Sequence, residues 1–401
     1  MRKYCKGINL LDENNIRKAI IVCLTDKYTR PDVIRLFREI SGKRYAEVRA
    51  DLKARDLSAY LDKLVAMMKD ELTNKQLKLR PIKYKDKIDG SSGKLRRIGI
   101  EDIKQQMYED LALIALEPFL CYVGEYQFAA IKGRGTTRGV VHIRKWLKDK
   151  TIRVAGKADI RKNYESVDRA VLMDFLRLHI KNEMLLWLIE QLIYTFERGL
   201  SIGSKLSQNL NNLYLGRMYH ELSENTYRIR KCKDGSIKRV NLVSHVFFYA
   251  DDILLLGTNV KDMHKAMKKV QTFAHDILHL DIKPSWMVFK TKLTDKKEDK
   301  GQLIDMLGFR IYRWHTTLRP ALFLRLRRAF KAARKTTQCH QRMSLRLARR
   351  CTAYYGYLKN SDSQHIINKY KIEQTMRIAR KVIRKYDKSK IYGRATECKS
   401  Y

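Results

Sequence analysis

The sequence lacks an uninterrupted apolar run of about 18 residues, the length that a helix needs to cross a membrane. It also lacks a basic segment followed by an apolar one at its N-terminus, the pattern of a secretory signal. No internal repeat or long linker is visible. These absences argue against a membrane protein, and we expect a soluble, cytoplasmic protein.

Cysteine is sparse, and the seven cysteines are scattered with no pair at the spacing of zinc ligands. Cys339 and His340 are adjacent, but no second pair accompanies them. We therefore expect reduced thiols that pack in the interior, rather than disulfides or a structural zinc site.

Acidic residues are few relative to basic ones: 43 Asp and Glu stand against 84 Lys and Arg, which gives a formal net charge of +41. Such an excess implies a polyanionic partner, and nucleic acid is the leading candidate. A length of 401 residues with 44% hydrophobic and 9% aromatic residues indicates a globular chain of two or three domains.

Hydrophobic periodicity predicts a mixture of helices and strands, an α+β protein. The predicted helices cover residues 33–40, 57–68, 102–116, 167–180, 184–195, 207–221 and 261–278. Extended segments are predicted within 79–100, around a turn at 89–94, and at 151–160 and 307–313. A charged insertion with a turn covers 231–238.

The composition changes after Pro320. Residues 321–390 contain 20 Lys and Arg but only three acids, and the arginines alternate with Leu and Ala. This pattern predicts helices with a basic face that follows a phosphate backbone. We expect an N-terminal helical region at 1–75, a central domain at 76–320, and a basic helical domain and tail at 321–401.

Two adjacent acids interrupt the apolar stretch HVFFYADDILLLG, residues 245–257. Apolar residues on both sides predict a hairpin of two core strands with Asp251 and Asp252 at its tip. The acids are interpreted either as an ordinary turn or as a metal site. Because desolvated carboxylates need compensation and oxygen ligands favour Mg²⁺ or Mn²⁺, the rest of the chain must decide between the two.

A second acid has the position that a two-metal site requires. In KADIRKNYESVD, residues 157–168, Asp159 ends an apolar strand and Tyr164 follows five residues later. Carboxylates from separate strands are needed to hold two ions around a reacting phosphate. Asp168 is a weaker candidate, since it falls where the next helix begins and suits a helix cap.

With these motifs in this order, the chain resembles the reverse transcriptases over about residues 79–390. The resemblance implies a right-hand polymerase fold, with fingers and palm built from an antiparallel sheet packed on helices, and a helical thumb. One matching block is YADD (249–252). The others are GKLRRIGIEDIKQQM (93–107), QFAAIKGRGTTRG (127–139), GLSIGSKLSQNLNNLYL (199–215), IKPSW (282–286) and MLGFRIYR (306–313).

One block is similar to a particular subfamily. Where many reverse transcriptases have Pro-Gln-Gly, this chain has Ser201, Ile202 and Gly203, followed by Ser207 and Gln208. The pattern resembles the enzymes of diversity-generating retroelements in bacteria and phages. The resemblance implies copying of a template-repeat RNA into cDNA with errors opposite adenines, in mutagenic retrohoming. Ser201 departs from the proline usual there.

The resemblance assigns roles to residues of the catalytic centre. Asp159, Asp251 and Asp252, with the backbone carbonyl of Ile160, would hold two Mg²⁺ ions, or Mn²⁺. Tyr164 stands at the position of a steric gate against a ribose 2′-hydroxyl. A core aromatic is the alternative for Tyr164.

Further residues are implied to bind the nucleotide or the primer. Lys94 and Arg96 would grip the triphosphate, unless they are ordinary surface charges. Ile202, Gly203 and Gln208 would lie beside the incoming nucleotide or template, with core packing as the alternative for Gln208. Lys283 would protonate the leaving pyrophosphate, although Pro284 departs from the usual pattern. Leu307, Gly308 and Phe309 would form the primer grip.

The implied partners are the template RNA, the cDNA primer strand, dNTPs and a small basic accessory variability protein. Two other hypotheses stay open. One is a phage-defence or otherwise domesticated reverse transcriptase, and the other is a non-catalytic RNA-binding scaffold with a decayed polymerase fold.

Overall fold

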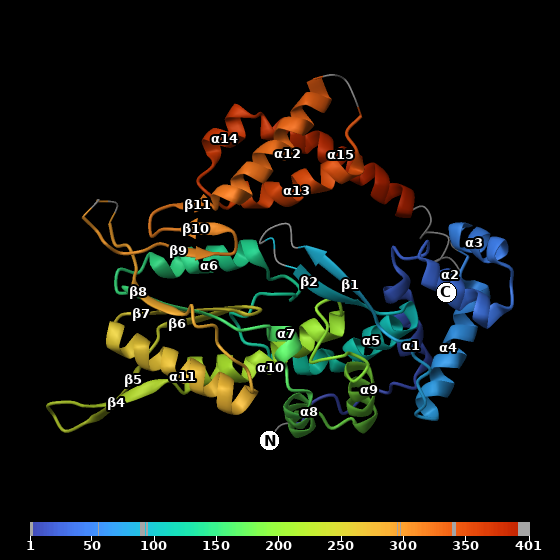
Figure 1. The fold of residues 1–401 in the computed structure, drawn as a ribbon, viewed down its shortest axis with the longest axis horizontal. Coiled ribbons are helices and arrows are strands. Elements are labelled where there is room, and N and C mark those ends of the chain that lie inside the picture. The colour runs from blue at the N-terminus through green and yellow to red at the C-terminus, as the bar shows by residue number, and fades with distance from the viewer. Residues whose placement is uncertain are drawn as a thin grey trace. The chain divides into compact units, whose positions relative to one another are not determined.

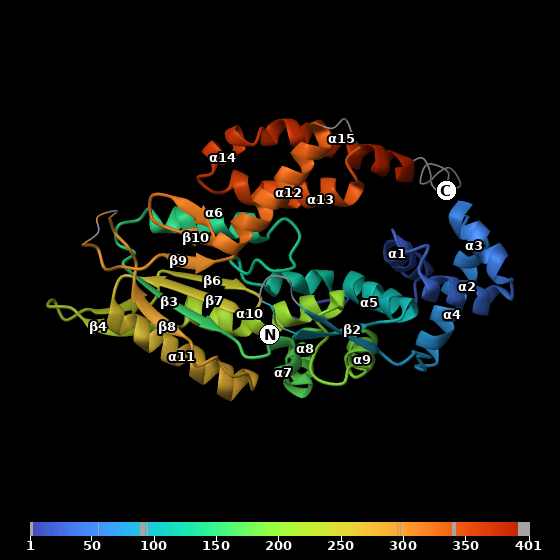
Figure 2. The same ribbon diagram turned by 45° about the horizontal axis from the view of Figure 1, so that its top comes forward.

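The computed structural model describes residues 3–54, 56–88, 93, 95–294, 296, 298–338 and 342–391. The chain forms two compact units, each built from segments that are distant in the sequence (Figures 1 and 2). The first comprises Met1–Gln127, Ile160–His220 and Val270–Lys283, and the second comprises Phe128–Asp159, Glu221–Lys269 and Pro284–Tyr401. Helices and antiparallel strands both contribute, so the α+β prediction is confirmed.

Four helices begin the first unit. Asp12 caps the first of them by accepting a hydrogen bond from the backbone N–H of Asn14. The second starts with a proline and ends at Gly42, whose φ of 71° suits glycine. The predicted helices at 33–40 and 57–68 are confirmed. The four are α1 (Glu13–Leu24), α2 (Pro31–Ser41), α3 (Tyr45–Ala54) and α4 (Ser58–Thr73).

A hairpin follows in the same unit: β1 (Lys83–Ile88) pairs antiparallel with β2 (Leu95–Ile100). The extended segments predicted within 79–100 are thereby confirmed. Of the predicted turn at 89–94, all but Gly93 lies outside the described residues.

Further helices belong to the first unit. Those at 103–116, 169–179, 183–193 and 205–224 match predicted helices, whereas the short ones at 117–122 and 163–166 were not predicted. The side chain of Asp102 caps α5 by accepting a hydrogen bond from the backbone N–H of Lys104, at 3.2 Å. These elements are α5 (Ile103–Leu116), the 3₁₀ helix η1 (Glu117–Tyr122), α7 (Asn163–Ser166), α8 (Arg169–His179), α9 (Glu183–Ile193) and most of α10 (Lys205–Glu224).

A four-stranded antiparallel sheet forms the centre of the second unit, with the strand order β6-β7-β3-β8. The apolar residues of the predicted YADD hairpin lie in its two strands and are buried. The strand predicted within 151–160 is also confirmed. The bounds are β3 (Val154–Asp159), β6 (His245–Tyr249), β7 (Asp252–Gly257) and β8 (Met287–Lys290).

Helices pack against this sheet, as the resemblance implied, and they cover both of its faces. On one face, a Cβ placed on Gly156 would lie 2.8 Å from Sδ of Met267, so α11 (Val260–Leu278) packs directly against the bare backbone of β3. On the other face, a Cβ placed on Gly139 of α6 (Thr136–Leu147) would lie 2.9 Å from Phe247. Close packing on both sides fixes the position of the strands.

Two small sheets extend the second unit. The charged insertion is a hairpin of its own, β4 (Tyr227–Lys231) with β5 (Ile237–Asn241), which projects from the unit (Figure 1). A three-stranded sheet consists of β9 (Ile304–Met306), β10 (Phe309–Ile311) and β11 (Thr316–Leu318).

The strand predicted at 307–313 is wrong in its bounds. Leu307 and Gly308 have φ angles of 58° and 86°, and Met306 pairs directly with Phe309. Leu307 and Gly308 therefore form a tight turn, each in a left-handed conformation, and the strand starts only at Phe309.

The basic region folds into helices, as predicted. In α13 the exposed arginines at 346, 349 and 350 alternate with buried Ala348 and Cys351. No helix among the described residues is long and apolar enough to cross a membrane. The helices are α12 (Pro320–Gln338), α13 (Leu345–Lys359), α14 (Gln364–Lys369) and α15 (Ile372–Ile391).

The cysteines within the described residues are free thiols, as predicted. Cys5, Cys23 and Cys351 pack in the interior, but the prediction of interior packing is wrong for Cys121, which is exposed, and for Cys232, which is half-buried. Burial raises the pKa of Cys23 to about 12, which makes this thiol inert at neutral pH. Cys339 and His340 lie outside the described residues.

Candidate active site

The tip of the β6–β7 hairpin carries the adjacent acids. Tyr249 pairs directly with Asp252, which leaves Ala250 and Asp251 as a two-residue turn. Ala250 has a φ of 52°, a left-handed conformation that is unfavourable for alanine. The prediction that the acids lie at the tip of a hairpin of core strands is confirmed.

Asp159 ends β3 directly opposite Asp252 of β7. Side chains of directly opposed residues share a face of the sheet, with Cβ atoms about 4.5–5.5 Å apart. Asp159, Asp251 and Asp252 are all half-buried. The three predicted aspartates therefore lie at one end of the sheet, Asp159 and Asp252 in neighbouring strands and Asp251 in the adjoining turn.

The aspartates influence one another electrostatically. Burial and the neighbouring charge of Asp251 raise the pKa of Asp252 to about 6, and Asp159 acts in the same direction. Lys157 and Arg319 oppose this rise without cancelling it. Negative charge is thus concentrated where β3 and the hairpin tip meet.

Two basic residues beside the aspartates were not predicted from the sequence. Lys157 precedes Asp159 by two positions in β3 and therefore lies on the same face of the sheet. Its Nζ donates a hydrogen bond to the backbone carbonyl of Asp305, at 2.8 Å. The Asp305 carboxylate forms an ion pair with Arg319. The alternation of Lys157 with Asp159 was the signal available in the sequence.

The three carboxylates fit a divalent cation in ligand chemistry and in charge. Carboxylate oxygens are the ligands that Mg²⁺ and Mn²⁺ prefer. Among the described residues, no three acidic, histidine or cysteine side chains are gathered closely enough to enclose an ion. Burial, together with the neighbouring negative charges, nevertheless raises the pKa of Asp252, and a bound cation would compensate those charges.

The first unit contains most of the predicted nucleotide-binding residues. Tyr164, in α7, is half-buried, and its backbone carbonyl accepts a hydrogen bond from the N–H of Leu200, at 2.8 Å. Gly199 has a φ of 45°, and a Cβ there would lie 2.3 Å from the same carbonyl oxygen. Only glycine allows the chain to pass so close to Tyr164.

Ile202, Gly203 and Gln208 lie just after this point. Nε2 of Gln208 donates to the backbone carbonyl of Ile202, at 3.5 Å. Gly203 is exposed, and a Cβ on it would lie 2.6 Å from the carbonyl oxygen of Gly99 in β2. The glycine therefore lets the segment lie directly against β2.

Arg96 is exposed on β2. It shares a face of that strand with Ile98, whose Cγ2 would be 3.5 Å from a Cβ on Gly203. Lys94 lies outside the described residues.

Ile160 has a fully buried side chain, and its backbone forms an isolated antiparallel bridge with Ile282. Lys283, which follows Ile282, is half-buried. The bridge thus places the predicted Lys283 next to the segment that follows Asp159 in the chain.

The predicted primer-grip residues form one compact feature of the second unit. Leu307 and Gly308 make the turn between β9 and β10, and the ring of Phe309 stacks on Tyr357 with centroids 5.3 Å apart. A Cβ on Gly308 would lie 2.9 Å from Cδ2 of Leu322. Packing from α12 and α13 therefore holds the turn.

Asp168 serves as a helix cap, as its alternative interpretation predicted. Its carboxylate accepts hydrogen bonds from the backbone N–H groups of Ala170 and Val171, and from His279 at 2.8 Å. Burial alone would raise its pKa, but these hydrogen bonds lower it below the usual value.

Comparison with known families agrees with this geometry. The family model described as reverse transcriptase (RNA-dependent DNA polymerase) matches residues 82–311, more than half of the chain. No curated protein matches the sequence. The matched segment includes the β1–β2 hairpin, β3 and the YADD hairpin. The chain therefore belongs to the reverse transcriptase family, which implies a right-hand polymerase fold, and it is an RNA-directed DNA polymerase.

Proposed function

We propose that this polymerase is the reverse transcriptase of a diversity-generating retroelement, and that Asp159, Asp251 and Asp252 form its metal-binding centre. The observation that carries the catalytic part is the cross-strand pairing of Asp159 with Asp252, combined with the raised pKa of Asp252. Residues 76–320 then correspond to fingers and palm, and residues 321–401 to a basic thumb and tail.

The aspartates would hold two Mg²⁺ ions, or Mn²⁺, with the carbonyl of Ile160 as a further ligand. When bound, such ions activate a primer 3′-hydroxyl and stabilise the leaving pyrophosphate. The protein contributes to this chemistry by orienting the three carboxylates. Residues of both faces are buried in β3 and β7, so these strands fix where the carboxylates project.

The residues of the first unit select the nucleotide. Tyr164 excludes a ribose 2′-hydroxyl, Arg96 and Lys94 bind the triphosphate, and Lys283 protonates pyrophosphate. Ile202, with Gly203 and Gln208, lies beside the nascent base pair. Because isoleucine offers neither a hydrogen-bond donor nor an acceptor, base selection there depends more on shape. This supports an error-prone enzyme.

The nucleic acid and the protein partners follow from the same proposal. The turn formed by Leu307 and Gly308, with Phe309, positions the primer strand, and the basic helices α12–α15 bind template RNA. A small basic variability protein assists copying, in the cytoplasm of a bacterial or phage-infected cell. A phage-defence enzyme with the same active site is the second candidate. Its gene would lack a neighbouring repeat pair that differs at adenines.

Primer extension on an RNA template tests the catalytic assignment. Asp251→Ala and Asp252→Ala should lose extension while RNA binding persists. Asp174→Asn, a change at an exposed acid on α8, is the matched control and should extend normally. Extension by both alanine variants at the wild-type rate would overturn the assignment, and loss of RNA binding in them would point to a folding defect.

Sequencing of the cDNA product tests the retroelement assignment. On a defined RNA containing all four bases, errors should concentrate opposite adenines. Errors spread evenly over the four template bases would favour a defence or domesticated enzyme. Absence of any synthesis by the wild type would favour a non-catalytic scaffold.

A further inference from the structure

Two glutamates are buried beneath the segment that carries Ile202 and Gly203. Glu101, directly after β2, is 3% exposed, and Glu109, in α5, is 2% exposed. Both belong to the first unit, as does the segment 201–204, called here the SIGS loop. Neither glutamate was predicted from the sequence to have a functional role.

Each glutamate accepts a hydrogen bond from one end of the SIGS loop. Oγ of Ser201 donates to Oε1 of Glu101, at 2.8 Å. Oγ of Ser204 donates to Oε2 of Glu109, also at 2.8 Å. The two residues between these serines, Ile202 and Gly203, are thus held from both sides.

The same serines also organise the backbone of the loop. Oγ of Ser201 accepts from the N–H of Gly203, at 3.3 Å, and Oγ of Ser204 accepts from the N–H of Ser207, at 3.0 Å. The Ser207 hydroxyl in turn accepts from the N–H of Ser201, at 3.2 Å. Ser201, which stands where proline is usual, therefore fixes the loop by hydrogen bonds instead of by a ring.

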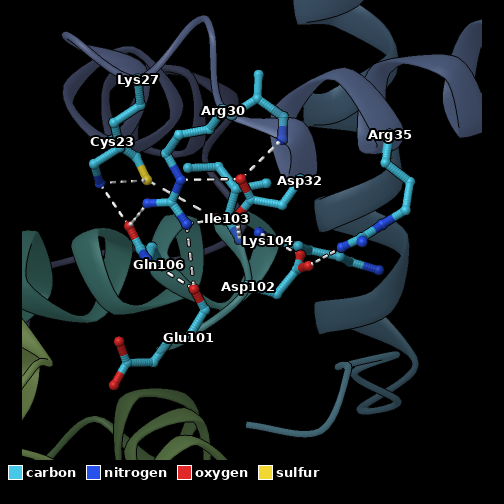
Figure 3. Close-up of polar contacts among 11 residues, drawn as sticks. Cys23, Lys27, Arg30, Asp32, Arg35, Glu101, Asp102, Ile103, Lys104 and Gln106 are labelled. Atoms are coloured by element: carbon cyan, nitrogen blue, oxygen red, sulfur yellow. Dashed lines mark hydrogen bonds and ion pairs between the residues drawn. The ribbon is translucent and has the colours of Figure 1, made fainter. Parts of the chain in front are cut away.

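The segment between α1 and α2 reaches this network through the backbone of Glu101. Its carbonyl accepts hydrogen bonds from Arg30, at 3.4 Å, and from Gln106, at 2.9 Å. Lys27 donates to Oε1 of Gln106, at 2.7 Å. Figure 3 shows Arg30 and Gln106 meeting at the carbonyl while the carboxyl group of Glu101 points away from them. The segment between α1 and α2 thus steadies Glu101 from the side opposite to the loop.

Stability alone does not account for this pair. Burial raises the pKa of Glu101, and burial together with the charge of Glu101 raises the pKa of Glu109 to about 8. Oε1 of Glu109 has no hydrogen-bond partner among the described residues. Burying incompletely satisfied carboxyl groups opposes folding. Such groups are typical of functional sites, where position matters more than stability.

We propose that Glu101 and Glu109 are positioning residues that fix the SIGS loop for binding of the incoming nucleotide. This inference rests on the proposed function, because it takes Ile202 and Gly203 to lie beside the nascent base pair. Neither glutamate touches the reacting atoms. Each acts through a serine at one end of the loop.

Steady-state primer extension with titrated dNTP tests this role. Ser204→Ala and Glu109→Ala should each raise the KM for dNTP by about 5- to 30-fold, the loss expected for one buried hydrogen bond to a carboxyl group, with a smaller change in kcat. The double variant should resemble either single variant, because both remove the same hydrogen bond. Glu109→Gln should stay within about twofold of the wild type, since Glu109 is largely protonated at pH 7 and glutamine is a neutral isostere.

Glu71 provides the matched control. It is also a buried glutamate of the first unit, 5% exposed, but it binds Lys104 and Tyr108 instead of the loop. Glu71→Gln should lower the thermal midpoint without changing the KM for dNTP. Thermal unfolding and RNA affinity, measured for every variant, separate misfolding from mispositioning.

An unchanged KM for dNTP in Ser204→Ala and Ser201→Ala would overturn the inference. These two changes remove single hydroxyl groups, so they decide the matter even if Glu109→Ala does not fold. A failure of the proposed function looks different: in that case the wild type itself would not extend primers, or Asp251→Ala would extend them normally.

Discussion

Asp252 is a residue at which function and stability are in conflict. Its pKa of about 6 lies above the ordinary value of 3.8 because burial and the charges of Asp251 and Asp159 disfavour ionisation. Between these two pH values the folded protein binds more protons than the unfolded chain, so its stability falls as the pH rises. A bound divalent cation would remove this penalty.

Asp252→Asn should therefore be inactive but more stable than the wild type at neutral pH. Without divalent metal, we expect its thermal midpoint to match that of the wild type near pH 4 and to exceed it by a few degrees near pH 7. Added Mg²⁺ should raise the midpoint of the wild type and leave that of Asp252→Asn unchanged. A constant difference across this pH range would contradict the assigned pKa.

Ile202 is the residue to which the proposal assigns relaxed base selection. Ile202→Gln restores a donor and an acceptor beside the nascent pair, so errors opposite template adenines should fall by about 2- to 10-fold, the discrimination that one hydrogen bond provides. Sequencing of cDNA from both enzymes measures this. Ile202→Leu is the control and should keep the wild-type error rate. An unchanged error rate in Ile202→Gln would show that this residue does not determine fidelity.

At the scale of elements, two tight turns present the candidate functional residues. Ala250 in the β6–β7 turn and Leu307 with Gly308 in the β9–β10 turn adopt left-handed conformations. Packed strands and helices must hold these conformations, because the local sequence, apart from the glycine, does not favour them. The turns are therefore sensitive to substitutions that the strands would tolerate.

Gly308→Ala tests how tightly the proposed primer-grip turn is packed. At a φ of 86° alanine is strained, and its Cβ would lie 2.9 Å from Leu322. We expect a loss of about 2–4 kcal/mol in the free energy of unfolding, with weaker primer binding. Gly235→Ala, at a φ of 80° with open space around the new Cβ, should lose only about 1–2 kcal/mol. Equal losses in a urea titration would show that packing at Gly308 is unimportant.

The sequence predicted elements better than it predicted their contacts. The YADD hairpin and the amphipathic helix α11 follow from local patterns, since each has the hydrophobic period of its own structure. The turn at Leu307 and Gly308 was missed because nothing local requires a left-handed leucine. The pairing of Asp159 with Asp252 was expected only through motif order, because strand register depends on tertiary packing. The contacts of Glu101 and Glu109 with the SIGS loop join residues about a hundred positions apart and leave no local signal.

At the scale of the whole molecule, charge is the dominant property. A formal net charge of +41 opposes compaction and favours a polyanion, and α12–α15 contribute many exposed cations. RNA binding should therefore weaken steeply with salt, since phosphate neutralisation releases counterions.

The salt dependence of RNA affinity tests the role of the basic helices. The slope of log K against log salt is negative. Replacing exposed Arg346 and Arg350 with glutamine should reduce its magnitude by about 0.7 for each phosphate that is no longer neutralised. Lys63→Gln, at an exposed position of α4, is the control and should leave the slope unchanged. An unaltered slope in the double arginine variant would show that the RNA does not bind at these positions of α13.

The decisive experiment is the primer-extension rate of Asp159→Asn in Mg²⁺, with RNA affinity and thermal midpoint determined on the same sample. Asp159 comes from a different strand than the YADD acids, so its replacement probes the shared carboxylate site itself. We predict a fall in rate of at least about 10³-fold, with RNA affinity unchanged. Extension at the wild-type rate by a folded, RNA-binding Asp159→Asn protein would show that the three aspartates do not form one catalytic centre.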